Sequence, residues 1–312
     1  MIVRLLTALW AAAAIACFGL PAEDSACLAA GTAQTSRLAP QESPLARHVA
    51  SIDCIDPDSG NRFAPLGVAF DLVGDLYVVD GDNSSILRIP DGTSQPVFFA
   101  KCPGDEGGCQ YVDILSDAGL FYVSDRGNGS VTVIDSGGRA IARRPVSASV
   151  GGIGLGTAGQ IFAAMTVDGS IVIVDLYGDK SPVTCPVFDS TDGSYPVDCI
   201  VTESDRVLVS DALSKKVLVL SVLGKKLGSL EGFEFKSPFG LARWDDRLLL
   251  AADSELGLVA VFDSDGRFVG TFGEGVLSSP GFLEVRDDGT IAIADAGTMT
   301  IEVFRFDKPK AK

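Results

Sequence analysis

A strand-like segment recurs six times along this chain, five times ending in Asp, and this repeat limits the folds open to it. The six copies read LYVVD, FYVSD, IFAAM, VLVSD, LLAAD and IAIAD, and they end at Asp80, Asp125, Met165, Asp211, Asp253 and Asp295. Successive copies lie 40 to 46 residues apart. This is the period of a four-stranded propeller blade.

Each repeat also keeps its internal register. Six residues after the end of each segment an aliphatic residue opens a second alternating run, at Ile86, Val131, Ile171, Val217, Val259 and Ile301. Another strand signal precedes each copy, as in PLGVAFDLVG, and an outer strand follows in stretches such as PVFFA and RFVGTFG. The pattern predicts an all-β, six-bladed β-propeller with four-stranded blades over residues 46–306.

The last repeat is incomplete at its C-terminal end. It ends near Phe306, and only the basic tail DKPKAK, residues 307–312, follows. The segment ARHVASI, residues 46–52, is predicted to supply the missing outer strand and close the ring. Such closure removes exposed sheet edges, which otherwise favour aggregation.

The repeats resemble the NHL repeat, whose blades open with Pro-x-Gly-Val/Ile and carry a strand ending in Ala/Ser-Asp before a turn that often contains Asn. PLGVAFDLVGDLYVVDGDNSSILRI is the closest match, with Asn83 in its turn, and Asn128 holds the same place in the second unit. The third unit departs from the pattern at Met165, so its turn must be held differently. The resemblance implies an exported, bacterial-type NHL repeat protein.

The chain is also distantly similar to the gluconolactonase and senescence-marker propellers. In that family a carboxylate and Asn/Asp set surrounds one metal. Here Leu66, Val197 and Phe239 stand at the corresponding middle positions, and none of them can ligate a metal. The metal motifs of that family are therefore absent from the expected places.

The N-terminus has the layout of a secretory signal, with one Arg ahead of an apolar stretch in MIVRLLTALWAAAAIAC. Cleavage near Ala22 would remove residues 1–22, whereas a lipoprotein route would acylate Cys17. Residues 23–45 are predicted to be a flexible linker. No later apolar run approaches the roughly 20 residues of a membrane helix. From the signal we therefore expect an exported protein that is periplasmic or secreted, or lipid-anchored at Cys17.

Six cysteines remain once Cys17 is removed or lipidated, and an even number in an exported protein suggests disulfides. Two pairs flank short loops and the third is what remains, so the predicted bonds are Cys102–Cys109, Cys185–Cys199 and Cys27–Cys54. The alternative, a metal site, has little support because the chain contains no CxxC.

The formal net charge of −16 disfavours nucleic acid and anionic lipid as partners. It agrees with a solvated surface, or with an acidic docking surface. The five aspartates that end the repeat segments have a structural explanation, because a short carboxylate accepts backbone N–H bonds in a tight turn. We therefore expect turn roles for Asp80, Asp125, Asp211, Asp253 and Asp295.

Propeller ligands usually sit in the channel that the first strands of the blades surround. Aligned on the Gly of PLGVAF, these strands place six equivalent residues there: Gly67, Asp113, Gly152, Asp198, Gly240 and Phe282. Asp113 and Asp198, together with Glu284 two residues along the sixth strand, form a candidate calcium site, because oxygen ligands suit a hard cation. The alternative is that the three side chains point to different heights and are simply hydrated.

His48 is the chain's single histidine and lies in the predicted closing strand. One histidine cannot form a multi-histidine metal site or a His-based acid–base pair, which disfavours streptogramin lyases and paraoxonase-like lactonases. The predicted function is a non-catalytic binding propeller of the cell envelope that presents loops to a protein, peptide or glycan. The alternative is a calcium-dependent hydrolase or lactonase that uses the channel carboxylates.

Overall fold

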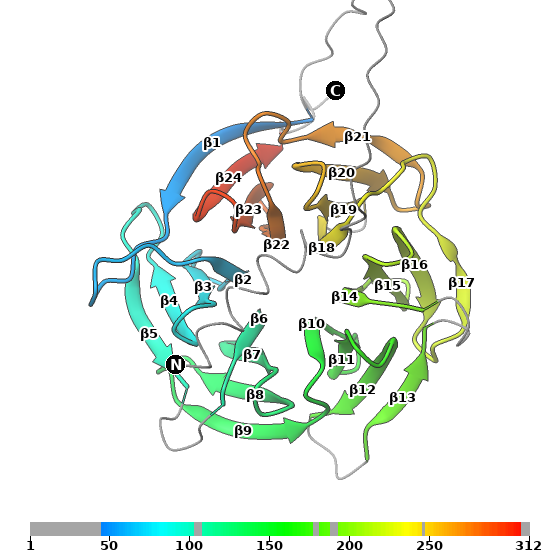
Figure 1. The fold of residues 1–312 in the computed structure, drawn as a ribbon, viewed down its shortest axis with the longest axis horizontal. Helices are drawn as coiled ribbons and strands as arrows, with labels where there is room; N and C mark the ends of the chain where they lie inside the picture. Colours follow the sequence, from blue (N-terminus) through cyan, green and yellow to red (C-terminus); the bar gives the residue numbers. More distant parts are fainter. Residues whose placement is uncertain (1–44, 103–107, 177–180, 188–192, 245–246, 307–312) are drawn as a thin grey trace, which may run out of the picture. The chain divides into compact units, whose positions relative to one another are not determined.

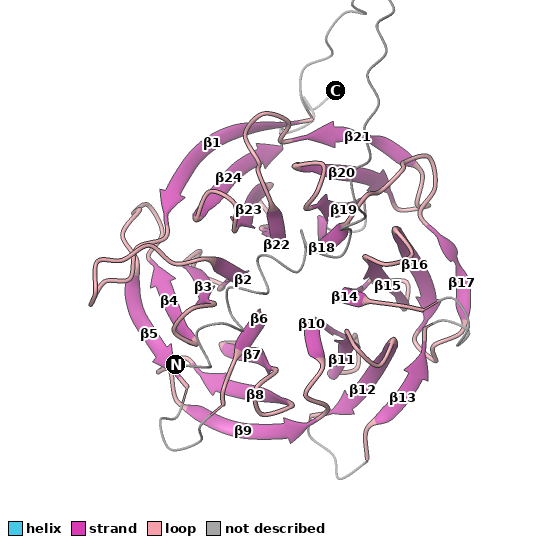
Figure 2. Cartoon of the chain, in the orientation of Figure 1, coloured by secondary structure: helices cyan, strands magenta, loops and turns pink. Residues whose placement is uncertain are grey.

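The computed structural model describes residues 45–102, 108–176, 181–187, 193–244 and 247–306. These residues form six four-stranded antiparallel sheets, which stand around a common axis (Figure 1). Figure 2 shows strands joined by loops, and no helix, in the part of the chain that is described. The predicted all-β, six-bladed propeller is confirmed. Among the described residues, no helix has the length and hydrophobicity needed to cross a bilayer.

The blades repeat one order of strands from the axis outward. The inner strands are β2 (Pro65–Phe70), β6 (Tyr111–Asp117), β10 (Val150–Leu155), β14 (Pro196–Val201), β18 (Pro238–Trp244) and β22 (Pro280–Val285). The second strands are β3 (Leu76–Asp80), β7 (Leu120–Asp125), β11 (Gln160–Met165), β15 (Arg206–Asp211), β19 (Leu248–Asp253) and β23 (Thr290–Asp295).

The third strands are β4 (Ser85–Ile89), β8 (Ser130–Asp135), β12 (Ser170–Asp175), β16 (Lys216–Ser221), β20 (Leu258–Asp263) and β24 (Thr300–Phe306). The outer strands are β5 (Val97–Lys101), β9 (Ala140–Pro145), β13 (Val183–Pro186), β17 (Lys226–Ser229), β21 (Phe268–Phe272) and β1 (Ala46–Asp53). Blade 1 is β2 to β5, and blade 6 is β22 to β24 with β1.

The hydrophobic core lies between the blades. It consists, in the described residues, of six clusters, and each cluster joins side chains of two neighbouring blades. The second strands are almost wholly buried because a neighbouring blade covers each of their faces. Such strands read as continuous apolar runs rather than alternating ones, as LLLAAD in β19 does.

The N-terminal strand β1 closes the ring, as predicted. It pairs antiparallel with β24, from Ala46 opposite Phe306 to Asp53 opposite Thr300. The carboxylate of Glu302 in β24, which is 3% exposed, joins the two strands by two contacts with β1: it accepts a hydrogen bond from the hydroxyl of Ser51 (2.6 Å) and lies 2.7 Å from Nε2 of His48. It also accepts a hydrogen bond from the hydroxyl of Thr300 in its own strand (2.7 Å).

The aspartates that end the second strands are all fully buried. In blade 6, Asp295 accepts a hydrogen bond from the amide of Gly297 in the following turn (2.9 Å), and from the amides of Ser278 (2.7 Å) and Ser279 (3.0 Å) in the loop before β22. Asp80 instead binds Asn83 through both the amide and the side chain of that residue. These contacts are the turn role that the sequence predicts.

Blade 3, which carries Met165 in place of the aspartate, holds its turn by other groups. The carboxylate of Asp168, three residues further on, accepts hydrogen bonds from the hydroxyls of Ser149 (2.7 Å) and Ser147 (3.1 Å). Thr166 adds a backbone and a side-chain bond to the carbonyl of Ser149. Met165 itself is fully buried in the core.

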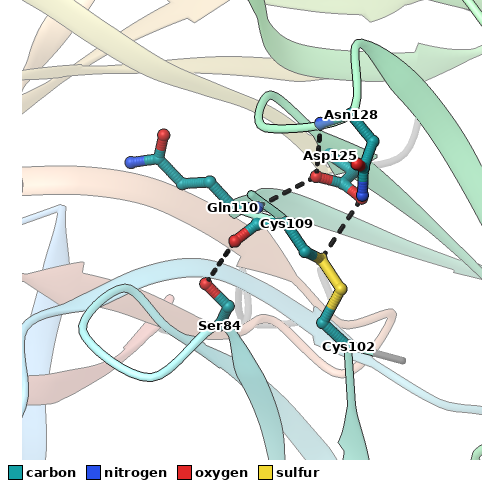
Figure 3. Close-up of a disulfide and its surroundings, with 6 residues drawn as sticks. All are labelled: Ser84, Cys102, Cys109, Gln110, Asp125 and Asn128. Carbon is teal, nitrogen blue, oxygen red and sulfur yellow. Dashed lines mark hydrogen bonds between the residues drawn. A yellow bond between two sulfur atoms is a disulfide. The ribbon is translucent and has the colours of Figure 1, made fainter. Parts of the chain in front are cut away.

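The predicted disulfide Cys102–Cys109 is present, with a Cα–Cα distance of 6.2 Å. Figure 3 shows how it joins the end of β5 to the loop before β6. Its Cys109 sulfur lies 3.2 Å from a carboxylate oxygen of Asp125, and the Cys109 carbonyl accepts a hydrogen bond from the hydroxyl of Ser84 (3.0 Å). The bond thus links blades 1 and 2 beside one of the turn aspartates.

The predicted disulfide Cys185–Cys199 is wrong, because both residues carry free thiols. Cys185 lies on the outer strand β13 of blade 3, whereas Cys199 lies on the inner strand β14 of blade 4. Cys54 is likewise a buried free thiol, and its predicted partner Cys27 lies outside the described residues. The same holds for the predicted signal, Cys17, the linker up to residue 44 and the tail, which all stay predictions.

Candidate functional site

The central channel contains a cavity of about 670 Å³ that residues of all six inner strands line. It extends from the middle of these strands to the turns that join them to the second strands, since both Asp117 and Thr157 lie along it. In the part of the chain that is described, five carboxylates and one guanidinium line this cavity, and they belong to Asp113, Asp117, Asp198, Glu203, Glu284 and Arg243. The structure thus brings the three predicted site residues together in one cavity.

The six positions equivalent to the Gly of PLGVAF alternate around the channel between a glycine and a larger residue. A side chain on Gly152 would place its Cβ 2.1 Å from Oδ1 and 2.8 Å from Cα of Asp198 in the next blade. Gly67 and Gly240 meet the backbones of Asp113 and Phe282 at similarly short distances. Neighbouring inner strands therefore touch directly, and only glycine fits in alternate blades.

Asp113 and Asp198 each connect two blades. One oxygen of Asp198 accepts a hydrogen bond from the amide of Cys199 (2.7 Å), and the other accepts one from the amide of Leu241 in blade 5 (2.7 Å). Asp113 bonds in the same way to its own strand at Ile114 (2.8 Å) and to Ile153 in blade 3 (2.9 Å). Each carboxylate thus joins its own inner strand to that of the following blade.

The inner strands need these acceptors because their pairing is irregular. All six depart from regular register with their second strand at this place, for example between Pro238 and Leu241. Such a bulge takes amides out of the sheet ladder, and a buried amide without an acceptor is costly. The aspartates satisfy these amides, which is neither of the roles that the sequence suggested for them.

Burial and mutual repulsion shift the acidity of the three carboxyls. Burial raises the pKa of Asp113 to about 7, against the amide hydrogen bonds, which act to lower it. Burial and then the charge of Asp113 raise the pKa of Asp198 well above its usual range. The same two causes raise the pKa of Glu284 to about 8, while the charge of Arg243 acts to lower it.

The predicted calcium site lacks a compact ligand set in this geometry. Among the residues that the structure describes, one group of three or more His, Cys, Asp or Glu has ligand atoms within 4.8 Å of one another. That group is Cys102, Cys109 and Asp125, whose two sulfurs form the disulfide. Asp113, Asp198 and Glu284 do not form such a group, and both oxygens of each aspartate already bind amides, so calcium stays a prediction.

Replacing Glu284 by Gln is expected to flatten the pH dependence of stability. The folded protein binds this proton more tightly than the unfolded chain, so the stabilisation is complete below about pH 4.5 and is lost as the pH rises through about 8. One such carboxyl contributes at most about 1.4 kcal/mol per pH unit. We expect the melting temperature of the wild type to fall between pH 5 and 8.5, and that of Glu284→Gln to fall less.

The measurement is a series of thermal melts across that range, with Glu255→Gln as the control. Glu255 is an exposed glutamate in the turn after β19, so its replacement should leave the slope unchanged. An identical slope in wild type and Glu284→Gln would show that Glu284 carries an ordinary proton affinity in the folded protein.

Alignment of the inner strands located Asp113, Asp198 and Glu284 but missed three other charged residues of the cavity. Arg243, Glu203 and Asp117 lie at the ends of inner strands or in the turns that follow them. Arg243 forms an ion pair with Glu203 across blades 5 and 4, with an N–O distance of 2.6 Å. A signal existed in the sequence, since Arg243 lies three residues after Gly240 in the aligned strand.

The fold resembles those of several solved propellers. A virginiamycin B lyase from Staphylococcus aureus, a catalytically inactive histidine-to-alanine variant solved with quinupristin, is 14% identical, with a TM-score of 0.62 over 82% of this chain and 88% of the lyase. The PQQ-bound aldose sugar dehydrogenase of Streptomyces coelicolor is 12% identical, with a TM-score of 0.63 over 83% and 97%.

A protein of unknown function from Bacteroides thetaiotaomicron is 15% identical, with a TM-score of 0.65 over 84% of this chain and 75% of that one. Comparison with protein-family models gives no match, and comparison with curated protein sequences gives none either. At these identities the structural likeness shows the six-bladed propeller fold alone, and the resemblance to NHL repeats stays a prediction.

Proposed function

We propose that this protein is a non-catalytic binding propeller, exported to the cell envelope, whose channel receives a positively charged group of a peptide or protein partner. The observation that supports this most directly is the charge of the cavity. Among the described residues, five carboxylates and one guanidinium line it, and that guanidinium is already paired with Glu203. Such a cavity attracts cations and repels anions.

The acidity of the three channel carboxyls supports a cationic ligand. Burial raises the pKa of Asp113, Asp198 and Glu284, and the charge of Asp113 raises the pKa of the other two further. The ionised forms of these carboxyls therefore lack compensating charge. A ligand cation would supply that charge and favour ionisation. Its affinity should therefore rise with pH through about 8, where Glu284 ionises.

The size of the cavity limits what enters it. A volume of about 670 Å³ lies in the range of small-molecule sites, so it accommodates one or two basic side chains or a diamine rather than a folded domain. The turns around its mouth are free to contact the remainder of a larger partner. Loops on a rigid scaffold are common binding surfaces.

Two catalytic alternatives have less support. The virginiamycin B lyase becomes inactive when one of its histidines is replaced by alanine, whereas the one histidine here, His48, lies on outer strand β1 beside Glu302. The calcium-dependent hydrolase that the sequence left open would use Asp113, Asp198 and Glu284. It is tested by the calcium arm of the experiment below.

The test is isothermal titration calorimetry of the protein at pH 8.5 with two peptides. One is the dibasic peptide acetyl-Gly-Lys-Lys-amide, and the other is the same peptide with both lysines ε-acetylated. We expect binding of the first alone and a loss of about tenfold or more in Glu284→Gln, since a charge-assisted contact contributes about 1.5–3 kcal/mol. Equal binding of both peptides would refute the proposal. Calcium chloride in place of the peptide, with a chelator control, shows whether a metal is the cation instead.

A further inference from the structure

A second cavity, of about 480 Å³, lies between blades 4 and 5, outside the channel. Its apolar wall consists of Leu208, Val219, Leu230 and Leu249, from β15, β16, the end of blade 4 and β19. None of the described residues that line it is aromatic, so it lacks the flat surface on which a sugar ring or a base would stack. The wall suits a short aliphatic group of about the size of a leucine side chain.

The polar rim of this cavity is rich in hydroxyls. Thr202 and Ser204 lie in the turn after β14, Ser229 ends β17, and Ser264 lies in the turn after β20. The hydroxyls of Thr202 and Ser204 are 3.1 Å apart and bonded to each other. Hydroxyls both donate and accept hydrogen bonds, so this rim can bind amide and carboxylate groups alike.

One of the two guanidiniums that line the cavity has no acidic partner among the described residues. Glu203 is paired with Arg243 (2.6 Å), and Asp265 is paired with Arg267 (2.7 Å). The guanidinium of Arg206 lies on the same rim and makes no hydrogen bond or ion pair with any residue that the structure describes. The cavity therefore combines an aliphatic wall with one guanidinium, that of Arg206, that has no ion-pair partner among the described residues.

We infer that this interblade cavity is a second binding site and that it takes a carboxylate carried on a short aliphatic body. The aliphatic group would lie against the four apolar side chains, and the carboxylate would accept two N–H bonds from Arg206, the geometry that a guanidinium favours. Two sources have this chemistry: a free branched short-chain acid, and the C-terminal residue of a peptide that ends in Leu or Val.

The two cavities share the Glu203–Arg243 ion pair, which lines both of them. A carboxylate in the interblade cavity attracts Arg243, which weakens its hold on Glu203 and leaves that carboxylate to the channel. The electrostatic potential in the channel then becomes more negative. This part rests on the proposed function: a cation in the channel and a carboxylate between the blades should each tighten the other's binding, by the same factor in both directions.

The test is a titration of the protein with four ligands, and saturation-transfer NMR detects their binding. The ligands are isovalerate, acetyl-Gly-Leu, isovaleramide and acetyl-Gly-Leu-amide. We expect the two carboxylates to bind and the two amides not to. Arg206→Gln should weaken binding about tenfold or more, and Ser229→Leu, which fills the cavity without changing its charge, should abolish it. Arg139→Gln, which removes an exposed arginine of blade 2, is the matched control and should bind as the wild type does.

Each outcome decides the matter. Stronger binding of acetyl-Gly-Leu than of isovalerate identifies a peptide C-terminus as the source, and the reverse identifies a free acid. Amides that bind as well as acids, or an Arg206→Gln variant that binds normally, would overturn the site. No channel cation is present in this titration, so its result does not depend on the proposed function. Repeating the titration in the presence of the dibasic peptide tests the coupling between the two sites alone.

Discussion

Replacing Asp198 by Ala is expected to lower the free energy of unfolding by about 2 to 6 kcal/mol, because it leaves two buried amides, those of Cys199 and Leu241, without their acceptor. Each such amide costs about 1–3 kcal/mol. The inner strands of blades 4 and 5 also lose the carboxylate that joins them. The measurement is urea unfolding at pH 7, followed by circular dichroism.

A set of variants separates this structural role from metal binding. Asp198→Asn keeps one oxygen acceptor and should be destabilised less than Asp198→Ala, and Asp58→Asn, which changes an exposed carboxylate, should unfold as the wild type does. The loss should be the same in chelator and in calcium. If instead Asp198→Ala unfolded like the wild type in chelator but lost a calcium-dependent gain in stability, the calcium hypothesis would replace the interblade role.

Removing the closing strand is expected to have the largest effect of all. A chain that begins at Asp53 lacks nearly all of β1, and with it the pairs to β24 and the contacts of Glu302 with Ser51 and His48. The buried Glu302 carboxylate loses partners while β24 becomes an exposed edge. Together these losses approach the whole stability of a typical domain, about 5–15 kcal/mol, so we expect no cooperative melting and self-association of the product.

The comparison is with a chain that begins at Leu45, which keeps β1 intact. Thermal melting and light scattering after size exclusion would measure stability and mass. A synthetic peptide of residues 45–53, added in trans, should restore part of the transition, because an extended strand can add to an open sheet edge. A truncated chain that stayed monomeric and melted at the same temperature as the control would show that β1 is dispensable.

The fold could be predicted from the sequence because its signals are local and repeated. The position of the aliphatic residue six places after each of Asp80, Asp125 and the other segment ends fixed the turn between second and third strands. The incomplete last repeat then required a strand from elsewhere, which β1 provides. Six copies of a weak pattern constrain the architecture far more than one strong pattern does.

The disulfide prediction failed where sequence distance and spatial distance diverge. Cys185 and Cys199 are close in the chain, but the connection between them leads from the outer strand of one blade to the inner strand of the next. A chain crosses the full width of a blade at each such boundary. Cys102 and Cys109 flank the same kind of boundary, between blades 1 and 2, but both lie outside the strands, after β5 and before β6. Cys185 and Cys199 instead lie within β13 and β14, so a short loop justifies a predicted disulfide only where both cysteines belong to the connection itself.

The position of the site was predicted from the sequence, but the hydrogen bonds of its aspartates to neighbouring blades were not. Aligning the inner strands placed Asp113 and Asp198 in the channel correctly, because that requires only the repeat register. Their partners, Ile153 and Leu241, belong to the following blades, and one repeat contains no information about which amide of its neighbour lacks an acceptor. The role of Arg243 was missed for a similar reason, since it depends on a contact with Glu203 in another blade.

The alternation around the channel also restricts how many blades such a ring can have. Gly67, Gly152 and Gly240 each make room for the larger residue of the next blade, so the repeating unit of the channel is a pair of blades. A ring with an odd number of blades would bring two glycines, or two larger residues, side by side at one boundary. Two larger residues side by side would clash, because a Cβ in place of any of these glycines would lie less than 3 Å from the backbone of the next inner strand, so the channel favours the gain or loss of blades in pairs.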